Sequence, residues 1–171
     1  MNADRLRELQ APLKARYKED PSSAMMTLRA KGRVSQGSIT CQLETGKPGV
    51  AAGLHPATGG DGTGACSGDM LLEALVGCAG VTLAAVATSM GIEMTSATVS
   101  AEGDLDFRGT LGVMKDAPVG FTKIRLAFAI DTAAPADKVK KLVELTERYC
   151  VVFQTLAKPP SIEVRIEAQG S

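Results

Sequence analysis

The sequence lacks the features of a nucleic-acid-binding protein. It has no tryptophan, aromatic residues make up only 4%, and Lys plus Arg equal Asp plus Glu at 19 each. A site that binds nucleic acid regardless of sequence needs an excess of positive charge and usually aromatic side chains on which bases stack. We therefore expect no nucleic-acid partner.

Metal-binding and nucleotide-binding patterns are also missing. The chain has one histidine, His55, and four cysteines (Cys41, Cys66, Cys78 and Cys150) without a C-x-x-C pair. Zinc sites usually show such closely spaced ligands, and the glycine-rich stretch 46–68 matches neither common nucleotide motif. The sequence predicts no metal and no cofactor. We interpret His55, beside Pro56, as a residue that shapes this loop rather than a catalytic base.

The start of the chain gives no sign of export. Residues 1–20 carry charges throughout and lack the apolar centre of a signal peptide. We expect a cytoplasmic protein, in which cysteines remain reduced or take part in redox chemistry instead of forming a disulfide scaffold.

One apolar stretch needs a test as a membrane span. Residues 74–92 contain no charged side chain, and a spanning helix needs about 20 predominantly apolar residues. The stretch is rich in Ala, Gly, Thr and Ser and has no basic residues at its edges. It therefore predicts a buried core helix and no membrane partner.

The expected order of elements is helix, strands, helix, strands, helix, strand, which is typical of an α+β fold with an antiparallel sheet. At 171 residues and 44% hydrophobic content, the chain can form one core. We divide it into an N-terminal helical extension, 1–20, and a domain, 21–171. The predicted elements are a helix within 1–20 that Pro12 kinks or divides, strands within 25–43, a helix capped by Ser67 or Asp69 and running to about Met90, strands at 92–107 and 121–131 joined by a hairpin turn at 107–112, a helix from Pro135, and a strand through Ile162, Val164 and Ile166.

Two cysteines lie where thiol chemistry is possible. Cys78 is inside the apolar helix, where most cysteines are small core residues, yet Gly77 and Ala79 leave room for another group to approach. Cys150 follows Tyr149. If the helix breaks there, the sulfur lies at a helix N-terminus, which favours the thiolate; if the helix continues, Cys150 only packs.

Three segments together resemble the OsmC/Ohr family. They are a Gly-Gly-Asp-Gly-Thr loop at 59–63, a stretch at 69–78 that opens with an acidic residue and ends on Cys78, and Tyr-Cys-Val-Val at 149–152. The similarity extends over roughly residues 25–168. The resemblance implies an OsmC-like fold, with antiparallel sheets and two long central helices in an intertwined homodimer.

The resemblance also implies an activity, that of a thiol-dependent peroxidase reducing organic hydroperoxides in oxidative stress defence. By motif, Cys78 is the peroxidatic and Cys150 the resolving cysteine, and a dithiol reductant restores both. Family members activate the first cysteine with an arginine that an acidic residue orients. Asp69 matches the acidic position, and Arg33 is the candidate arginine, although it can equally be a solvated turn charge.

Other interpretations remain open at this point. The same dimer can bind an apolar small molecule without catalysis, with both cysteines present but not tuned. A disulfide oxidoreductase acting on proteins is disfavoured because there is no C-x-x-C. Cys66 has no family counterpart, and we interpret it as an inert loop residue rather than a third redox thiol. Arg108 is a further candidate for reaching a partner's site.

Overall fold

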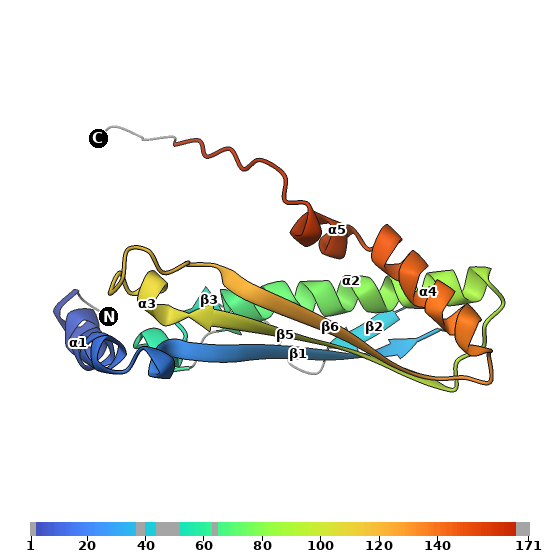
Figure 1. Ribbon diagram of the computed structural model, residues 1–171, viewed down its shortest axis with the longest axis horizontal. Helices are drawn as coiled ribbons and strands as arrows, with labels where there is room; N and C mark the ends of the chain where they lie inside the picture. The colour runs from blue at the N-terminus through green and yellow to red at the C-terminus, as the bar shows by residue number, and fades with distance from the viewer. Residues whose placement is uncertain (1–2, 37–39, 44–51, 63–64, 167–171) are drawn as a thin grey trace.

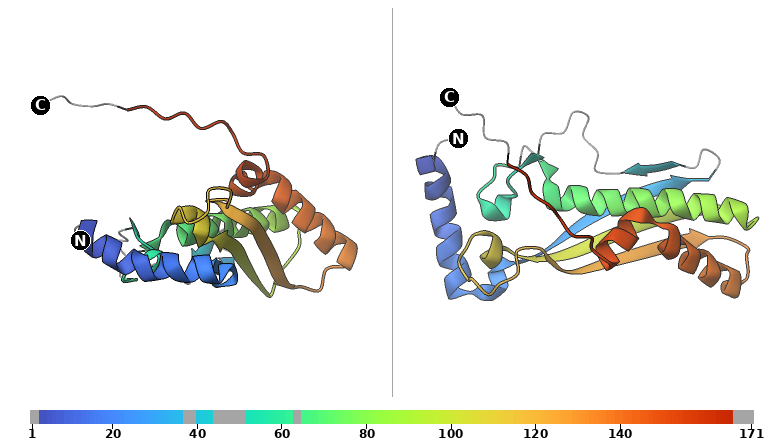
Figure 2. Two further views of the ribbon diagram at one scale, coloured as in Figure 1. Left: turned by 60° about the vertical axis from the view of Figure 1, so that its left-hand side comes forward. Right: turned by 90° about the horizontal axis from the view of Figure 1, so that it is seen from above.

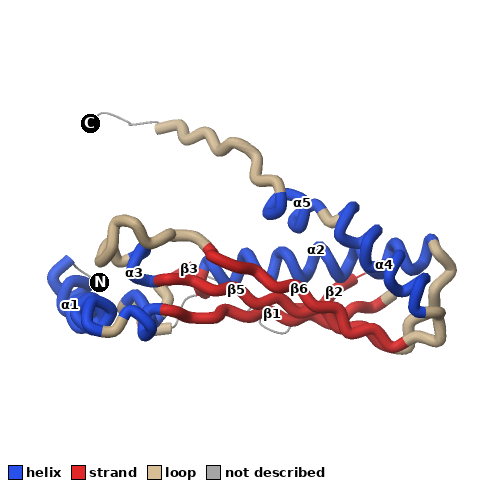
Figure 3. Tube along the Cα trace, viewed as in Figure 1, coloured by secondary structure: helices blue, strands red, loops and turns tan. Residues whose placement is uncertain are grey.

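The computed structural model describes residues 3–36, 40–43, 52–62 and 65–166. One long antiparallel sheet carries a long helix along one face, and a second helical segment lies beside that helix (Figure 1, Figure 3). The predicted α+β class with an antiparallel sheet is confirmed.

The main sheet has the order β2-β1-β5-β6, with each neighbouring pair antiparallel. Its strands are β1 (Met25–Ser35), β2 (Thr40–Leu43), β5 (Ser96–Asp106) and β6 (Phe121–Asp131). Along β5 buried residues alternate with half-buried ones, because successive side chains of a strand point to opposite faces. One face is thus apolar and packs against a helix. A small second sheet pairs β3 (Ala52–Gly53) with β4 (Ala65–Cys66) in parallel.

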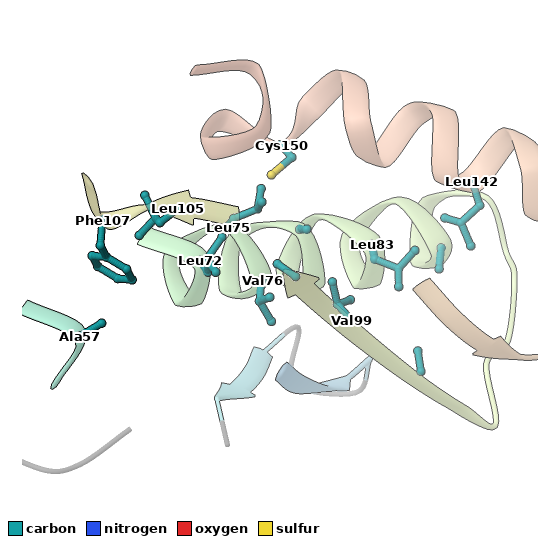
Figure 4. Close-up of a cluster of buried hydrophobic side chains, with 14 of the residues drawn as sticks. Ala57, Leu72, Leu75, Val76, Leu83, Val99, Leu105, Phe107, Leu142 and Cys150 are labelled. Atoms are coloured by element: carbon teal, nitrogen blue, oxygen red, sulfur yellow. The ribbon is translucent and has the colours of Figure 1, made fainter. Parts of the chain in front are cut away.

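The helix on this face is α2 (Ser67–Ser89), which provides most of the core. Leu72, Val76 and Leu83 are fully buried, as is Val99 of β5 on the facing sheet (Figure 4). The helix ends where expected, since Gly91 follows with a φ of +64° that glycine adopts readily. Its N-cap is Cys66 and not Ser67 or Asp69, and the Cys66 side chain makes no capping hydrogen bond.

The described residues leave part of the α2 surface exposed. An 18-residue window of this helix has a mean hydropathy of 2.0, enough by length and composition to cross a membrane, yet 50% of the window is buried inside the protein. Met70, Ala74, Val81 and Ala85 are exposed at helical spacing. Seen from above in Figure 2, α4 and α5 lie along one side of α2.

The second helical segment is interrupted at Cys150. Helix α4 (Ala136–Tyr149) ends there, and α5 (Val151–Ala157) begins directly after it. Cys150 has the extended backbone angles φ −73° and ψ 110°, so it ends one helix and caps the next. Of the two interpretations of the sequence, the helix break is therefore confirmed. Helix α4 packs against α2 through Leu142 and Thr146.

The N-terminal helix α1 (Ala3–Glu19) runs unbroken through Pro12, so the expected division is wrong. It crosses one end of the sheet (Figure 1). Tyr17, only 1% exposed, donates a hydrogen bond of 2.8 Å from its hydroxyl to the carbonyl oxygen of Ala57. Gln10 donates from its amide to the carbonyl oxygen of Thr58 at 3.2 Å. These bonds attach α1 to the short 3-10 helix η2 (Pro56–Thr58).

Two further expectations need correction. The connection from β5 to β6 contains a short helix, α3 (Phe107–Thr110), in place of a simple hairpin turn, because Asp106 caps the Arg108 backbone N–H. Residues 158–166 form no strand, and Ile162 is 87% exposed. This segment extends away from the body (Figure 1), and a strand needs a neighbour to satisfy its backbone groups. One more 3-10 turn, η1 (Pro21–Ala24), joins α1 to β1.

Candidate active site

The fold brings Cys78 and Cys150 together. Cys78 is half-buried near the middle of α2, and Cys150 is fully buried at the break between α4 and α5. In Figure 4 the Cys150 sulfur points towards α2. The thiol of Cys150 donates a hydrogen bond to the sulfur of Cys78. The two thiols therefore interact, and both are free cysteines.

The surroundings of Cys78 favour its thiolate. Burial by itself raises the pKa of this thiol, but several donors outweigh it and hold the pKa below its ordinary value. The donors are, in order of effect, the backbone N–H of Val152, the thiol of Cys150, the backbone N–H of Val151 and the hydroxyl of Thr82. None of these groups is a charged side chain. The helix break thus supplies the stabilisation of the thiolate.

Cys150 has the opposite character. Burial raises its pKa most, the backbone N–H of Phe153 counteracts this, and the hydrogen bond to Cys78 raises the pKa further. The Phe153 N–H donates to the Cys150 Sγ at 3.4 Å. The pair is therefore unequal: the pKa of Cys78 lies below its ordinary value, and the pKa of Cys150 is raised to about 11.

An apolar groove lies near the cysteine pair, although neither cysteine lines it. It has a volume of about 330 Å³ and lies between α2, β6 and α5. Leu75 of α2 is one helical turn before Cys78, and Phe153 of α5 is the residue whose N–H binds the Cys150 sulfur. Its other lining residues are Phe121, Thr122, Lys123, Ile124, Leu126, Leu156 and Ala157. The groove can accept an apolar group against Leu75 and Phe153.

Asp69 lies at the head of α2, far from the sulfurs. Asp69 and Cys78 are nine positions apart, which corresponds to about 13.5 Å along a helix. Burial raises the pKa of Asp69, the nearby His55 lowers it, and Glu73 raises it again. The His55 ring stacks on Phe107 at 5.1 Å between centroids. The basic group beside Asp69 is thus a histidine and not the expected arginine.

The structure does not bring Arg33 to Cys78 within the chain. Gly32 pairs with Val99 in the sheet, and both are buried on the face that α2 covers. Arg33 is the next residue and pairs with Thr98, so it lies on the opposite face. Within one chain, therefore, Arg33 does not lie on the side of the sheet that faces Cys78.

Arg108, the other arginine considered, is engaged elsewhere. Its guanidinium forms an ion pair with Asp106, with the Nε bonded to both carboxylate oxygens at 3.0 Å. Asp106 is the last residue of β5, and Arg108 lies in α3, within the connection to β6.

The head of α2 also borders a cavity of about 370 Å³ whose wall includes His55 and Cys66. The Cys66 thiol is free and half-buried. Within the part of the chain that the structure describes, no three His, Cys, Asp or Glu side chains are placed to hold a metal ion.

Sequence reasoning missed the donors around Cys78. Thr82 follows it by four residues, so the helical period alone places both on one face. The N–H groups of Val151 and Val152 carry no sequence signal, because any residue at those positions offers the same donor.

The fold and this site define an α+β protein in which a cysteine of the central helix faces a second cysteine at a helix break. The model of the OsmC-like protein family matches residues 60–165, and the chain therefore belongs to that family. No curated protein matches it. The crystal structure of an OsmC-like hydroperoxide resistance protein from Jannaschia sp. CCS1 superposes with a TM-score of 0.60 at 15% identity, over 86% of this chain and 97% of that one. At this identity the similarity shows the fold.

Proposed function

We propose that this protein is a thiol-dependent peroxidase that reduces organic hydroperoxides, with Cys78 as the peroxidatic and Cys150 as the resolving cysteine. The observation that carries the proposal is the unequal, hydrogen-bonded thiol pair. Attack on a peroxide needs a thiolate, and resolution needs a second thiol within reach of the first. Both requirements have matching features at Cys78 and Cys150.

The reaction proceeds in two steps. The Cys78 thiolate attacks the terminal oxygen of the hydroperoxide, the O–O bond breaks, and the alkoxide leaves and takes up a proton to give the alcohol. Cys78 is then a sulfenic acid. The Cys150 sulfur attacks the Cys78 sulfur, hydroxide leaves with the Cys150 proton as water, and a disulfide forms. Two thiols supply the two electrons, and a dithiol reductant returns them.

The groove near the cysteine pair supports organic over inorganic peroxides. Leu75, Phe153 and Leu156 offer apolar surface to an alkyl or aryl group, which gains about 25 cal/mol for each Å² removed from water. Hydrogen peroxide has no such group. The peroxide end of an organic substrate is then held next to Cys78.

Thiol counting tests the cycle. The protein receives one equivalent of cumene hydroperoxide, and free thiols are counted in the wild type and in Cys78→Ser. We expect the wild type to lose two thiols per chain, with Cys78 linked to Cys150 by mass spectrometry, and the variant to lose none. Unchanged thiol counts in the wild type, or loss at Cys66 only, would contradict the peroxidase proposal.

The exposed part of the α2 surface supports a homodimer. A soluble protein seldom leaves a large apolar surface in water, and a second copy of the same helix face matches Val81 and Ala85 in chemistry. The exposed Ile162 and Val164 in the C-terminal segment offer the same partner a strand. In sedimentation, Val81→Arg should shift the protein from dimer to monomer, whereas Val119→Arg, on an exposed connection, should leave the mass unchanged.

The second candidate function is non-catalytic binding of an apolar small molecule by the same dimer. The groove and the cavity near His55 favour it. The two candidates differ in the reactivity of Cys78, since a ligand-binding protein does not need a thiolate. Iodoacetamide labelling of Cys78 well below pH 8 supports the peroxidase, and labelling only above that pH supports the binding protein.

The remaining assignments follow the same proposal. We place the protein in the cytoplasm, where a dithiol reductant can keep the pair reduced, and residues 21–171 form its OsmC-like domain. Asp69 orients the head of α2 through His55 and does not contact the sulfurs. Arg33 enters no step, since it lies on the far face of the sheet.

A further inference from the structure

Phe121 separates the apolar groove from the cavity at the head of α2 (the head cavity). Among the residues that the structure describes, it is the only one that lines both spaces. The residues that follow it in β6, 122–124, line the groove, and the two that precede it, 119–120, line the head cavity. On α2 the same division falls between Leu75 in the groove and Leu71 in the head cavity. The Phe121 side chain therefore stands where the two spaces meet.

Two features of the sheet place the Phe121 ring at this boundary. The register of β5 and β6 shifts after Asp104, so Leu105 pairs with Phe121 and Thr122 is left as the extra residue of a bulge. Phe121 therefore shares the face of the sheet on which Leu105 is buried. Its ring also lies directly over Gly103, where a Cβ atom would overlap it. The bulge directs the ring towards α2, and the glycine leaves room for it.

The reactive cysteine lies on the same line along α2. Leu71, Leu75 and Cys78 are separated by four and three positions, so they form one stripe of the helix. From Leu71 to Cys78 the helix rises by about 10.5 Å. In Figure 4, Phe107 from the wall of the head cavity lies beyond Leu75, towards the head of the helix. The groove thus leads from near the cysteine pair to Phe121, and the head cavity continues the line behind the ring.

We propose that Phe121 is the end wall of the groove and restricts this protein to compact organic hydroperoxides, whose organic part is an aryl or a short alkyl group. The inference rests on the proposed function and names the substrate class of the same site. A hydroperoxide with its peroxide end at Cys78 directs its organic part along Leu75 towards the ring. A compact group ends before Phe121, whereas a long straight chain meets the ring and leaves part of its length in water.

Alcohol binding to the full chain tests the wall without any thiol chemistry. Straight-chain alcohols are the products of straight-chain hydroperoxides, and the series from butanol to decanol is titrated by calorimetry. Affinity should rise about fourfold for each methylene that enters the groove, the equivalent of about 0.8 kcal/mol. In the wild type the rise should stop once the chain reaches Phe121. In Phe121→Ala it should continue to longer chains, because the head cavity becomes accessible.

Further variants control for general effects of substitution. Leu71→Trp fills the head cavity from an exposed position, so it should leave the wild-type series unchanged and restore the length limit in Phe121→Ala. Phe128 is a half-buried phenylalanine of the same strand that lines neither space, and Phe128→Ala should keep the limit. If Phe121→Ala does not fold, Phe121→Leu, which only shortens the side chain, should move the limit in the same direction.

The outcomes distinguish the wall from the peroxidase. An affinity that rises through decanol in the wild type would overturn the wall, and so would an unchanged limit in Phe121→Ala or the absence of binding by every alcohol. None of these results alters the thiol count after cumene hydroperoxide, on which the peroxidase depends. A limit that moves in Phe121→Ala, in a protein that loses no thiols to hydroperoxide, would retain the wall for an apolar ligand and reject the peroxidase.

Discussion

The thiol of Cys150 donates a hydrogen bond to the sulfur of Cys78, across the contact between a helix break and the middle of the central helix. This contact makes two chemically identical side chains unequal. The acceptor is stabilised as a thiolate, and the donor is held as a thiol.

Removing the donor should slow the reaction of Cys78. In Cys150→Ala the thiolate loses one hydrogen bond, which contributes about 1–1.5 kcal/mol. We expect the iodoacetamide labelling of Cys78 at pH 7, read by peptide mass spectrometry, to fall about tenfold. Cys150→Ser keeps a hydroxyl donor and should fall much less. Equal rates in both variants would show that the hydrogen bond does not control the thiolate.

Phe153 should determine the preference for organic peroxides. Phe153→Ala removes an apolar side chain from the groove while the backbone N–H to Cys150 stays. Losing most of a phenyl contact, about 1.5–3 kcal/mol, should lower kcat/KM for cumene hydroperoxide at least about tenfold, and for hydrogen peroxide by less than about threefold. Val151→Ala, on the exposed side of the same helix, is the control. If kcat/KM falls equally for both peroxides, the groove does not select organic peroxides.

Tyr17 should anchor the N-terminal helix. Its hydroxyl donates to the buried Ala57 carbonyl oxygen, and Tyr17→Phe leaves that oxygen without a donor. The free energy of unfolding in urea should fall by about 1–3 kcal/mol. Tyr149→Phe is the matched control, because Tyr149 is 57% exposed. A loss of the same size at Tyr149 would contradict the anchor.

Asp69 should make stability depend on pH in a defined direction. Burial holds the pKa of this carboxyl above its ordinary value, with His55 and Glu73 as smaller influences. Its contribution to stability is therefore fully present at acid pH and is lost as the pH rises through the raised pKa. We compare the free energy of unfolding in urea of Asp69→Asn with that of the wild type at two pH values. The value for Asp69→Asn minus that for the wild type should be higher at pH 7 than at pH 3.5.

Asp116→Asn, at an exposed position, controls for the loss of one negative charge. If the difference in free energy of unfolding between wild type and Asp69→Asn does not change with pH, burial does not raise the pKa of Asp69.

The sequence by itself determined much of this protein. The alternation in β5 and β6, the charge-free stretch that becomes α2, and the Gly91 that ends it all follow from local periodicity and backbone preference. The context of the two cysteines was sufficient to indicate the family. These properties depend on neighbours along the chain, so a single sequence records them.

Only the tertiary structure decided the site. The packing of distant segments decides three features of the site. It determines whether the helix breaks at Cys150, which N–H groups reach Cys78, and on which face of the sheet Arg33 lies. The strand expected at 162–166 needs a neighbouring strand, and none of the strands that the structure describes pairs with it. A residue's chemical type is written in the sequence, but its pKa and its partners are set by burial and by donors from elsewhere in the fold.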